Sequence, residues 1–354
     1  MLFLLTELKP IINASITESG AILLGEFFEI DSYAGRPVRV VTHMHSDHTL
    51  YLSKSKRHST YILATQPTLD SLTVLGEKLP ENKTIPLGYN KPLRIVDETI
   101  TFVKSTHVIG SAQVVVETKE GFRLGYTSDF KFPGTKIMSD LDVLVIDATY
   151  GQEHMIRPFK QEIETLLADL VNEILSKNKP VRILGYYGKL QEVMEILRKN
   201  NVSAPFVMPK KVYELTNVAC KHGMKINDFF EEDSKEGSEV KKDNWYVYFQ
   251  HMNSKKGTLS QTADLILSGW FFESPIKKII EKNKYEKWLV AFSDHGDFQD
   301  VFAYVSESKP KMLIVDGSRT DRVTADFFSN FVKKKLNLKS SVLPSQKIQL
   351  KEED

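Results

Sequence analysis

Four metal-ligand side chains occur within one short stretch of the chain. His43, His45, Asp47 and His48 form the pattern H-x-H-x-D-H, so three histidines and one aspartate fall within six residues. Neutral imidazole suits zinc, and a carboxylate adds negative charge and can reach a second ion. The pattern therefore predicts a loop that binds cations. The alternative is a polar surface loop, which has no need of so many ligands.

Strands are expected to position this loop and two later candidates. Residues 37–41 are rich in β-branched side chains, which is typical of a buried strand, and they end at the loop. His107 follows the predicted strand 99–103, and Asp129 follows the predicted strand 123–127. A lone histidine after a strand is more often a core or surface residue, but the order of these residues after the first pattern favours a shared site.

The H-x-H-x-D-H pattern resembles the signature of the metallo-β-lactamase superfamily. This resemblance implies two divalent metal ions, with zinc at the first site and zinc or manganese at the second. The expected ligands are His43, His45 and His107 for the first ion, Asp47 and His48 for the second, and Asp129 for both. Asp31, which follows the predicted strand 21–30, is expected to orient one ligand imidazole.

The remaining hydrophobic pattern predicts an α/β protein. Strands are predicted at residues 21–30, 38–41, 99–103, 113–117, 123–127, 143–146, 181–184, 205–208, 287–292 and 311–315. Helices are predicted at residues 160–175, 189–198, 212–222 and 298–307. From residue 160 the two alternate, which is typical of an α/β layer on a parallel sheet. Residues 227–243 are predicted to form a surface loop, residues 333–354 to fray, and residues 1–5 to form a strand and not a signal peptide.

Three later motifs resemble the β-CASP nuclease subfamily of this superfamily. They are the segment 142–151 around Asp147, the Ser268-Gly269-Trp270 element, and the segment 292–298 around His295. The resemblance implies a metallo-β-lactamase αββα sandwich of the α/β class with an inserted α/β β-CASP cap. The implied divisions are residues 1–150 and 291–335 for the sandwich, 151–290 for the cap and 336–354 for a polar C-terminal tail.

The same resemblance implies catalytic roles for four residues, Asp47, Asp129, Asp147 and His295. Asp147 would hold the imidazole of His295 in one tautomer and favour its charged form. His295 could then contact the scissile phosphate or protonate the leaving oxygen. The alternative is that His295 caps the helix predicted from residue 298.

One position departs from the β-CASP pattern. RNA-acting members have a late histidine ligand at the place where this chain has Asp316, and Artemis-like DNA members have an apolar residue there. An aspartate could still complete the second metal site and would favour manganese or magnesium over zinc. The alternative is that Asp316 only shapes a turn with Gly317.

Three residues are candidates for substrate binding. Lys189 opens a predicted helix, where backbone N–H groups and an ammonium group can receive a phosphate. Ser254 and Lys255 lie in a basic polar loop that could contact a nucleic-acid backbone. The alternatives are an ordinary helix start and a solvated loop. Four further histidines are assigned structural or surface roles, namely His58, His154, His222 and His251.

Composition excludes several classes of protein. With 354 residues and a net charge of +1, the chain can bury a large core and carries no global basic field. Its one cysteine, Cys220, rules out a disulfide framework and a cysteine zinc finger, and fits the cytoplasm. No apolar stretch approaches the length of a membrane span, so no membrane partner is expected.

Together these features predict a nuclease that cleaves phosphodiester bonds with a metal-activated hydroxide. The resemblance extends to archaeal mRNA 3′-end processing factors and to ligase-associated, Artemis-like exonucleases. RNA is the first expected partner and DNA the second, and a homodimer is left open. The rival functions are a metallohydrolase of small thioesters or lactones and a scaffold subunit. The six core ligands argue against the scaffold, and the long insertion argues against the small substrate.

Overall fold

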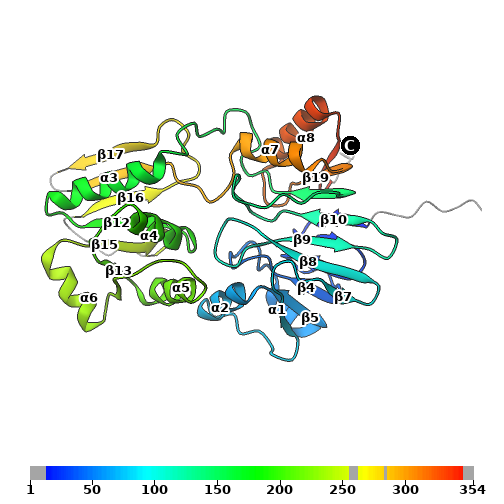
Figure 1. Cartoon of the computed structure of the whole chain (residues 1–354), viewed down its shortest axis with the longest axis horizontal. Coiled ribbons are helices and arrows are strands. Elements are labelled where there is room, and N and C mark those ends of the chain that lie inside the picture. Colours follow the sequence, from blue (N-terminus) through cyan, green and yellow to red (C-terminus); the bar gives the residue numbers. More distant parts are fainter. Residues whose placement is uncertain (1–12, 255–261, 283–284, 346–354) are drawn as a thin grey trace, which may run out of the picture.

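The computed structural model describes residues 13–254, 262–282 and 285–345, and these residues form three β-sheets. Two sheets and four helices build one part of the molecule, shown on the right in Figure 1. The third sheet and its helices build the other part, on the left. The predicted strand at residues 1–5 lies outside the described residues.

Two sheets pack face to face in the first part. The six-stranded sheet has the order β1 (Ala14–Ile16), β2 (Ile22–Leu24), β3 (Phe28–Ile30), β4 (Val38–Val40), β5 (Tyr61–Ala64) and β6 (Thr84–Pro86). The seven-stranded sheet has the order β20 (Lys339–Leu343), β19 (Met312–Asp316), β11 (Val143–Ile146), β10 (Arg123–Tyr126), β9 (Ala112–Glu117), β8 (Glu98–Lys104) and β7 (Leu93–Ile95). Their facing side chains form one buried core that includes Phe28, Val40, Phe102 and Tyr126.

Helices cover the outer faces of this pair of sheets. Helices α1 (Leu52–His58) and α2 (Gln66–Val74) pack on the six-stranded sheet, where Leu52, Ile62 and Leu72 meet. Helices α7 (Phe298–Ser308) and α8 (Arg322–Leu336) pack on the other sheet. The result is the predicted αββα sandwich. Among the described residues, no helix has both the length and the apolar character that a membrane crossing requires.

The third sheet carries the alternating helices and strands. Its order is β14 (Phe229–Glu231), β13 (Phe206–Met208), β15 (Val247–His251), β12 (Val181–Gly185), β16 (Ala263–Leu267), β18 (Tyr285–Val290) and β17 (Ile276–Lys282). Every pairing is parallel except that of β17 with β18. Its helices are α3 (Ile163–Ser176), α4 (Lys189–Lys199), α5 (Lys210–Lys221) and α6 (Lys235–Val240). The predicted α/β class and parallel layer are therefore present.

The prediction of one strand over residues 21–30 was wrong. The chain turns at Gly25, whose φ is 63°, and β2 pairs antiparallel with β3. The carboxylate of Glu98 accepts hydrogen bonds from the N–H groups of Glu26 and Phe27, at 2.8 and 3.2 Å, and so fixes the turn. A Cβ at Gly25 would lie 2.3 Å from that carboxylate, which explains the glycine.

Two segments predicted to lack structure form regular elements. Within residues 227–243 the chain forms β14, α6 and a short 3-10 helix (Lys241–Asp243), and the Ser234 side chain caps α6. Within residues 333–354, α8 continues to Leu336 and β20 then pairs parallel with β19. Contacts with neighbouring elements order both segments, which their polar composition does not indicate. Val342 of β20 is buried.

Candidate metal centre

The candidate ligands come from loops at the ends of strands in both sheets of the sandwich. His43, His45, Asp47 and His48 follow β4, His107 lies between β8 and β9, and Asp129 follows β10. These loops converge, so all six predicted ligands lie in two overlapping groups whose members are within 4.8 Å of one another. The six residues predicted as ligands are therefore neighbours in space.

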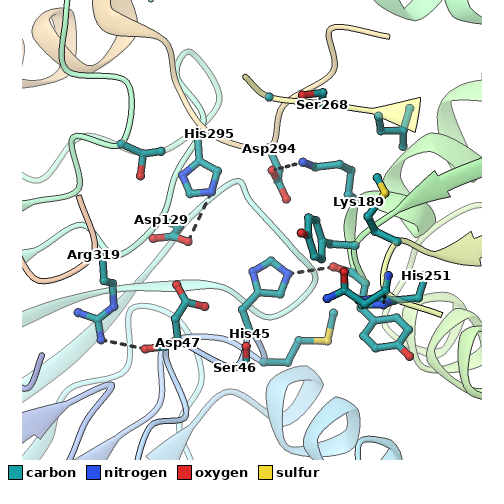
Figure 2. A pocket seen from close by; sticks show the side chains of 18 of the residues that line it. His45, Ser46, Asp47, Asp129, Lys189, His251, Ser268, Asp294, His295 and Arg319 are labelled. Atoms are coloured by element: carbon teal, nitrogen blue, oxygen red, sulfur yellow. Dashed lines mark hydrogen bonds and ion pairs between the residues drawn. The ribbon is translucent and has the colours of Figure 1, made fainter. Parts of the chain in front are cut away.

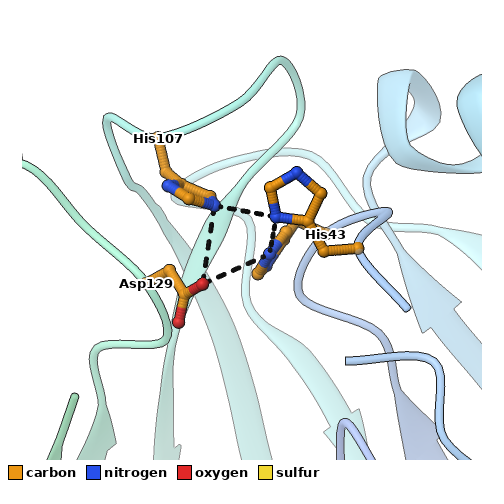
Figure 3. Close-up of side chains that lie close together, drawn as sticks. His43, His107 and Asp129 are labelled. Atoms are coloured by element: carbon orange, nitrogen blue, oxygen red, sulfur yellow. Dashed lines mark hydrogen bonds and ion pairs between the residues drawn. The ribbon is translucent and has the colours of Figure 1, made fainter. Parts of the chain in front are cut away.

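The first group has the separations that a tetrahedral ion requires. Nδ1 of His45 lies 3.1 Å from Nε2 of His43 and 3.2 Å from Nε2 of His107. Oδ2 of Asp129 lies 3.6 and 3.5 Å from the same two Nε2 atoms (Figure 3). Ligand bonds of about 2.0–2.1 Å in a tetrahedral site place donor atoms roughly 3.3–3.4 Å apart. These donors therefore fit one metal ion.

A second group shares Asp129 with the first. Nε2 of His48 lies 3.4 Å from Oδ2 of Asp47 and 3.2 Å from Oδ1 of Asp129. This nitrogen is buried and makes no hydrogen bond among the described residues. A buried polar atom without a hydrogen bond is costly, and a cation between the ring and the two nearby carboxylates would satisfy it.

Buried hydrogen bonds orient the rings. Oδ2 of Asp31 accepts a hydrogen bond from Nδ1 of His48 at 2.7 Å, which is the contact expected of Asp31. The backbone carbonyls of Tyr187 and Asp294 accept from His45 Nε2 and His107 Nδ1, both at 2.9 Å. Each ring thereby turns its other nitrogen toward the ligand group. The last two contacts were not predicted, because a backbone acceptor has no sequence signature.

Burial favours neutral rings at the first group. It holds the pKa of His43 well below its usual value and lowers the pKa of His107 to about 4, although Asp294 and Asp129 oppose the second shift. Neutral imidazole is the form that binds a metal ion. The lowered pKa values of His43 and His107 and the positions of their Nε2 atoms therefore both favour metal binding.

Asp147 and His295 form the predicted pair beside these groups. Nδ1 of His295 donates to Oδ2 of Asp147 at 3.1 Å, and Oδ1 of Asp147 accepts from the backbone and side chain of Thr149. Burial disfavours a charged His295, but Asp129 and the hydrogen bond that His295 donates to Asp147 raise its pKa to about 9. The alternative of a helix cap is wrong, because Asp297 caps α7.

Asp316 does not join the ligands. Its Oδ1 accepts from the backbone and side chain of Ser318, at 2.8 and 2.5 Å, and its Oδ2 accepts from Nη1 of Arg319 at 3.0 Å. It belongs to none of the possible ligand groups among the described residues. Asp316 instead shapes the turn that follows β19, which is the alternative that the sequence left open. Arg319 also donates to the carbonyl of Asp47 at 3.2 Å, so the pair braces the first loop.

A cavity of about 790 Å³ opens over both groups and lies between the two parts of the molecule (Figure 2). The sandwich contributes His45, Asp47 and Asp129 to its wall. An aromatic wall is formed by Tyr150, which follows β11 of the sandwich, and by residues of the other part, namely Tyr186, Tyr187, His251 and Trp270.

Two other residues singled out from the sequence, His251 and Lys189, line this cavity, and Ser254 does not. His251 was assigned a structural or surface role, but it lines the cavity and packs against Tyr187 with tilted rings whose centroids lie 4.1 Å apart. Lys189 also lines the cavity, but its ammonium group is buried against Asp294 at 3.0 Å. Ser254 is exposed on the turn after β15, and Lys255 lies outside the described residues.

The sequence of the chain is similar to those of several other proteins. No family model matches the chain. Over 140 residues, 39% of this chain, it is 47% identical to the "Uncharacterized protein in lig 3′region" of Acidianus ambivalens, of which 99% is matched. It is 23% identical over 220 residues, 53% of this chain, to the "Probable RNase MJ4" of Methanocaldococcus jannaschii, of which 51% is matched.

A longer alignment and one solved structure extend the comparison. The chain is 23% identical over 312 residues, 82% of its length, to "DNA ligase 6" of Arabidopsis thaliana, of which 22% is matched. The chain thus spans about half of the probable RNase and less of the ligase. A crystal structure of a protein of unknown function from Enterococcus faecalis V583 has a TM-score of 0.60 at 12% identity, and covers 87% of this chain and 79% of its own. That likeness shows a common fold.

We expect Asp129→Asn to weaken metal binding at both groups, because Asp129 offers an oxygen to each. Loss of a residue that only supports a ligand costs about 10–100-fold in metal affinity, and a shared ligand should cost at least as much. Metal retained after dialysis against a chelator gives the measurement, and circular dichroism checks the fold. Asp97→Asn, on the surface, is the control. Equal retention by all three proteins would contradict a shared ligand.

We expect His295 to titrate with a pKa of about 9 in the metal-free protein, and Asp147→Asn to lower that value. A raised pKa means that the carboxylates stabilise the folded protein most below pH 6.5, and that this contribution is lost as pH rises through about 9. NMR titration of the ring gives the pKa, and thermal unfolding between pH 6 and about 10 gives the stability. A ring that titrates near 6.5 in both proteins would rule out the pairing.

Proposed function

This chain belongs to the β-CASP branch of the metallo-β-lactamase superfamily, and we propose that it is a metal-dependent nuclease acting on phosphodiester bonds. The observation that carries the proposal is the pair of ligand groups that share Asp129 and lie beside the pair of Asp147 and His295. A phosphodiester needs charge stabilisation on the attacked phosphate and a proton for the leaving oxygen. These neighbouring groups offer both.

We propose two divalent ions at this centre. Three nitrogens and one oxygen in the first group suit zinc, and two carboxylates with one nitrogen in the second group suit zinc or manganese. When bound, the ions supply a lowered pKa for water between them and positive charge beside the phosphate. His43, His45 and His107 would hold the first ion, Asp47 and His48 the second, and Asp129 both.

His295 is proposed as the proton donor. Its Nδ1 is engaged by Asp147, so its Nε2 faces Asp129 at 3.7 Å and lines the cavity. In the metal-free protein the raised pKa keeps the proton on this ring at neutral pH, and Nε2 is the atom that would pass it to a leaving oxygen. Asp147 acts through His295 by fixing the ring and favouring its charged form.

We propose that residues 1–150 and 291–335 form the catalytic part and residues 151–290 form a cap. The expected C-terminal tail is not separate from the catalytic part, because β20 completes its seven-stranded sheet. The cavity lies between the catalytic part and the cap, and Asp47 reaches into it with a side chain that is 58% exposed. Ser254, next to the cavity residues Met252 and Asn253, is proposed to contact the backbone of that polymer together with Lys255.

The aromatic wall favours nucleic acid over a small thioester or lactone. Trp270 is 61% exposed and Tyr186 is 45% exposed, although both are large and apolar. The Trp270 and Tyr150 rings form a T-shaped pair with centroids 5.0 Å apart, and most of the Trp270 side chain stays exposed. Bases of single-stranded nucleic acid stack on such rings without regard to sequence.

RNA is our first proposed substrate and DNA the second. A relative named as a probable RNase supports RNA. The alignment with a protein named as a DNA ligase spans more of the chain and supports DNA. Asp316 gives no guide between the two, because its carboxylate is engaged by Ser318 and Arg319.

We expect the metal-loaded protein to cleave an end-labelled nucleic acid. The assay compares single- and double-stranded RNA and DNA with a thioester and a lactone, at equal enzyme and with a chelator-treated control. Binding to the cleaved polymer should weaken steeply with salt, because phosphate contacts release counterions. Faster turnover of the thioester or lactone than of all four nucleic acids would overturn the proposed function.

We expect Trp270→Ala to weaken binding of a single-stranded oligonucleotide by about 5- to 150-fold, which corresponds to one base stack of about 1–3 kcal/mol. Trp245→Ala is the matched control, because Trp245 is 45% exposed and does not line the cavity. Fluorescence anisotropy gives the affinity, and Trp270→Phe should retain most of it. Equal losses from the two alanine variants would show that Trp270 binds no base.

A further inference from the structure

Three consecutive residues of the third-sheet part reach into the ligand loops of the sandwich. Tyr187 and Gly188 lie in the turn between β12 and α4, and Lys189 is the first residue of α4; we call these three residues the docking turn. Each of the three contacts the loops of His45 or His107, or the residue that holds His107. No other turn from the third-sheet part reaches a candidate metal ligand through a hydrogen bond among the described residues.

Tyr187 supplies the contact to His45. Its carbonyl accepts a hydrogen bond from Nε2 of His45 at 2.9 Å. That bond places the ring proton on Nε2. Nδ1, the atom that faces His43 and His107, is then unprotonated and can bind a metal ion. The orientation of one ligand ring in the sandwich is therefore fixed by the backbone of the other part.

Gly188 allows the close approach. A Cβ at this position would lie 2.1 Å from Cγ1 of Val108 and 3.3 Å from Cε of Met44, and its φ is 84°. Val108 follows His107, and Met44 stands between His43 and His45. The turn thus packs directly on the two ligand loops, at a distance and in a backbone conformation that other residues would resist.

Lys189 acts on the third ligand through Asp294. Its Nζ lies 3.0 Å from Oδ1 of Asp294, and the two side chains are almost fully buried. The backbone carbonyl of Asp294 accepts the hydrogen bond from Nδ1 of His107. Removing one partner of a buried ion pair leaves the other charge unpaired, so Asp294 would move to find solvent or another partner. Such a movement would displace the carbonyl that holds His107.

We propose that the docking turn positions the first metal group and that Lys189 is a positioning residue for it, not a phosphate-binding residue. Metal affinity at His43, His45 and His107 then depends on the third-sheet part being seated on the sandwich. The inference rests on the metal centre of the proposed function. It adds that the centre is completed only when both parts of the molecule are in contact.

The test uses Lys189→Met, which keeps the length of the side chain and removes its charge. Asp294→Asn removes the other charge of the pair and keeps the backbone carbonyl. Lys221→Met is the matched control, because Lys221 on α5 pairs with Asp70 on α2 across the same two parts, at 2.7 Å and away from the ligands. Zinc affinity is measured by competition with a chelating dye, and the visible spectrum of the cobalt-substituted protein reports the geometry of the first group.

We expect Lys189→Met and Asp294→Asn each to lower zinc affinity by about 10–100-fold and to alter the cobalt spectrum, as loss of a supporting contact does. The double variant should lose little more than either single variant, because both remove one interaction. Lys221→Met should match wild type. Thermal unfolding of the metal-free proteins separates a loss of fold from a loss of metal.

Three results would overturn the inference or its premise. Wild-type zinc affinity and cobalt spectrum in both single variants would show that the docking turn does not position the first group. A raised KM for nucleic acid in Lys189→Met with unchanged zinc affinity would assign Lys189 to phosphate binding instead. A wild-type protein that binds no zinc would remove the metal centre itself, and the proposed function with it.

Discussion

One buried carboxylate controls the chemistry of the centre. Asp129 lies within 3.7 Å of imidazole nitrogens of four residues, His43, His48, His107 and His295. The rings respond differently. Burial lowers the pKa of His43 and His107, whereas burial is outweighed at His48 and His295, where Asp129 acts together with Asp31 or Asp147 to raise the pKa. The first pair is therefore ready to bind metal, His295 is ready to hold a proton, and His48 must release one when a metal ion binds.

The sequence predicted which residues would lie together at the centre better than it predicted the elements that carry them. His43, His45, Asp47 and His48 are found by spacing, because residues in one loop stay close whatever the rest of the chain does. His107 and Asp129 required strand ends to be located, and β8 and β10 were both identified. The turn at Gly25 was missed because it depends on Glu98, which is distant in sequence. The strand β20 was missed because its order comes from pairing with β19 and not from its own composition.

Contacts made through the backbone, or between residues far apart in the chain, account for the missed parts of the site. The carbonyls of Tyr187 and Asp294 hold two ligand rings, but a carbonyl belongs to every residue and so carries no signal. For Asp316 the sequence signal was misleading. Its position suggested a ligand, but Ser318 and Arg319 occupy its oxygens, and Arg319 extends to the loop of Asp47. The effect of Asp316 on the second group is thus mechanical support for that loop, passed on by a guanidinium group.

The backbone contact from Tyr187 to His45 links the two parts of the molecule at the ligand loops. If the cap served only to cover the substrate, its contacts with the sandwich could lie anywhere along their border. Ion pairs such as Asp70 with Lys221 do lie away from the centre, but the docking turn lies on the ligand loops themselves. Coupling between two binding events is reciprocal. Under the proposed function, a polymer that draws the cap onto the sandwich would therefore strengthen the first metal group, and an ion bound there would hold the cap over the polymer.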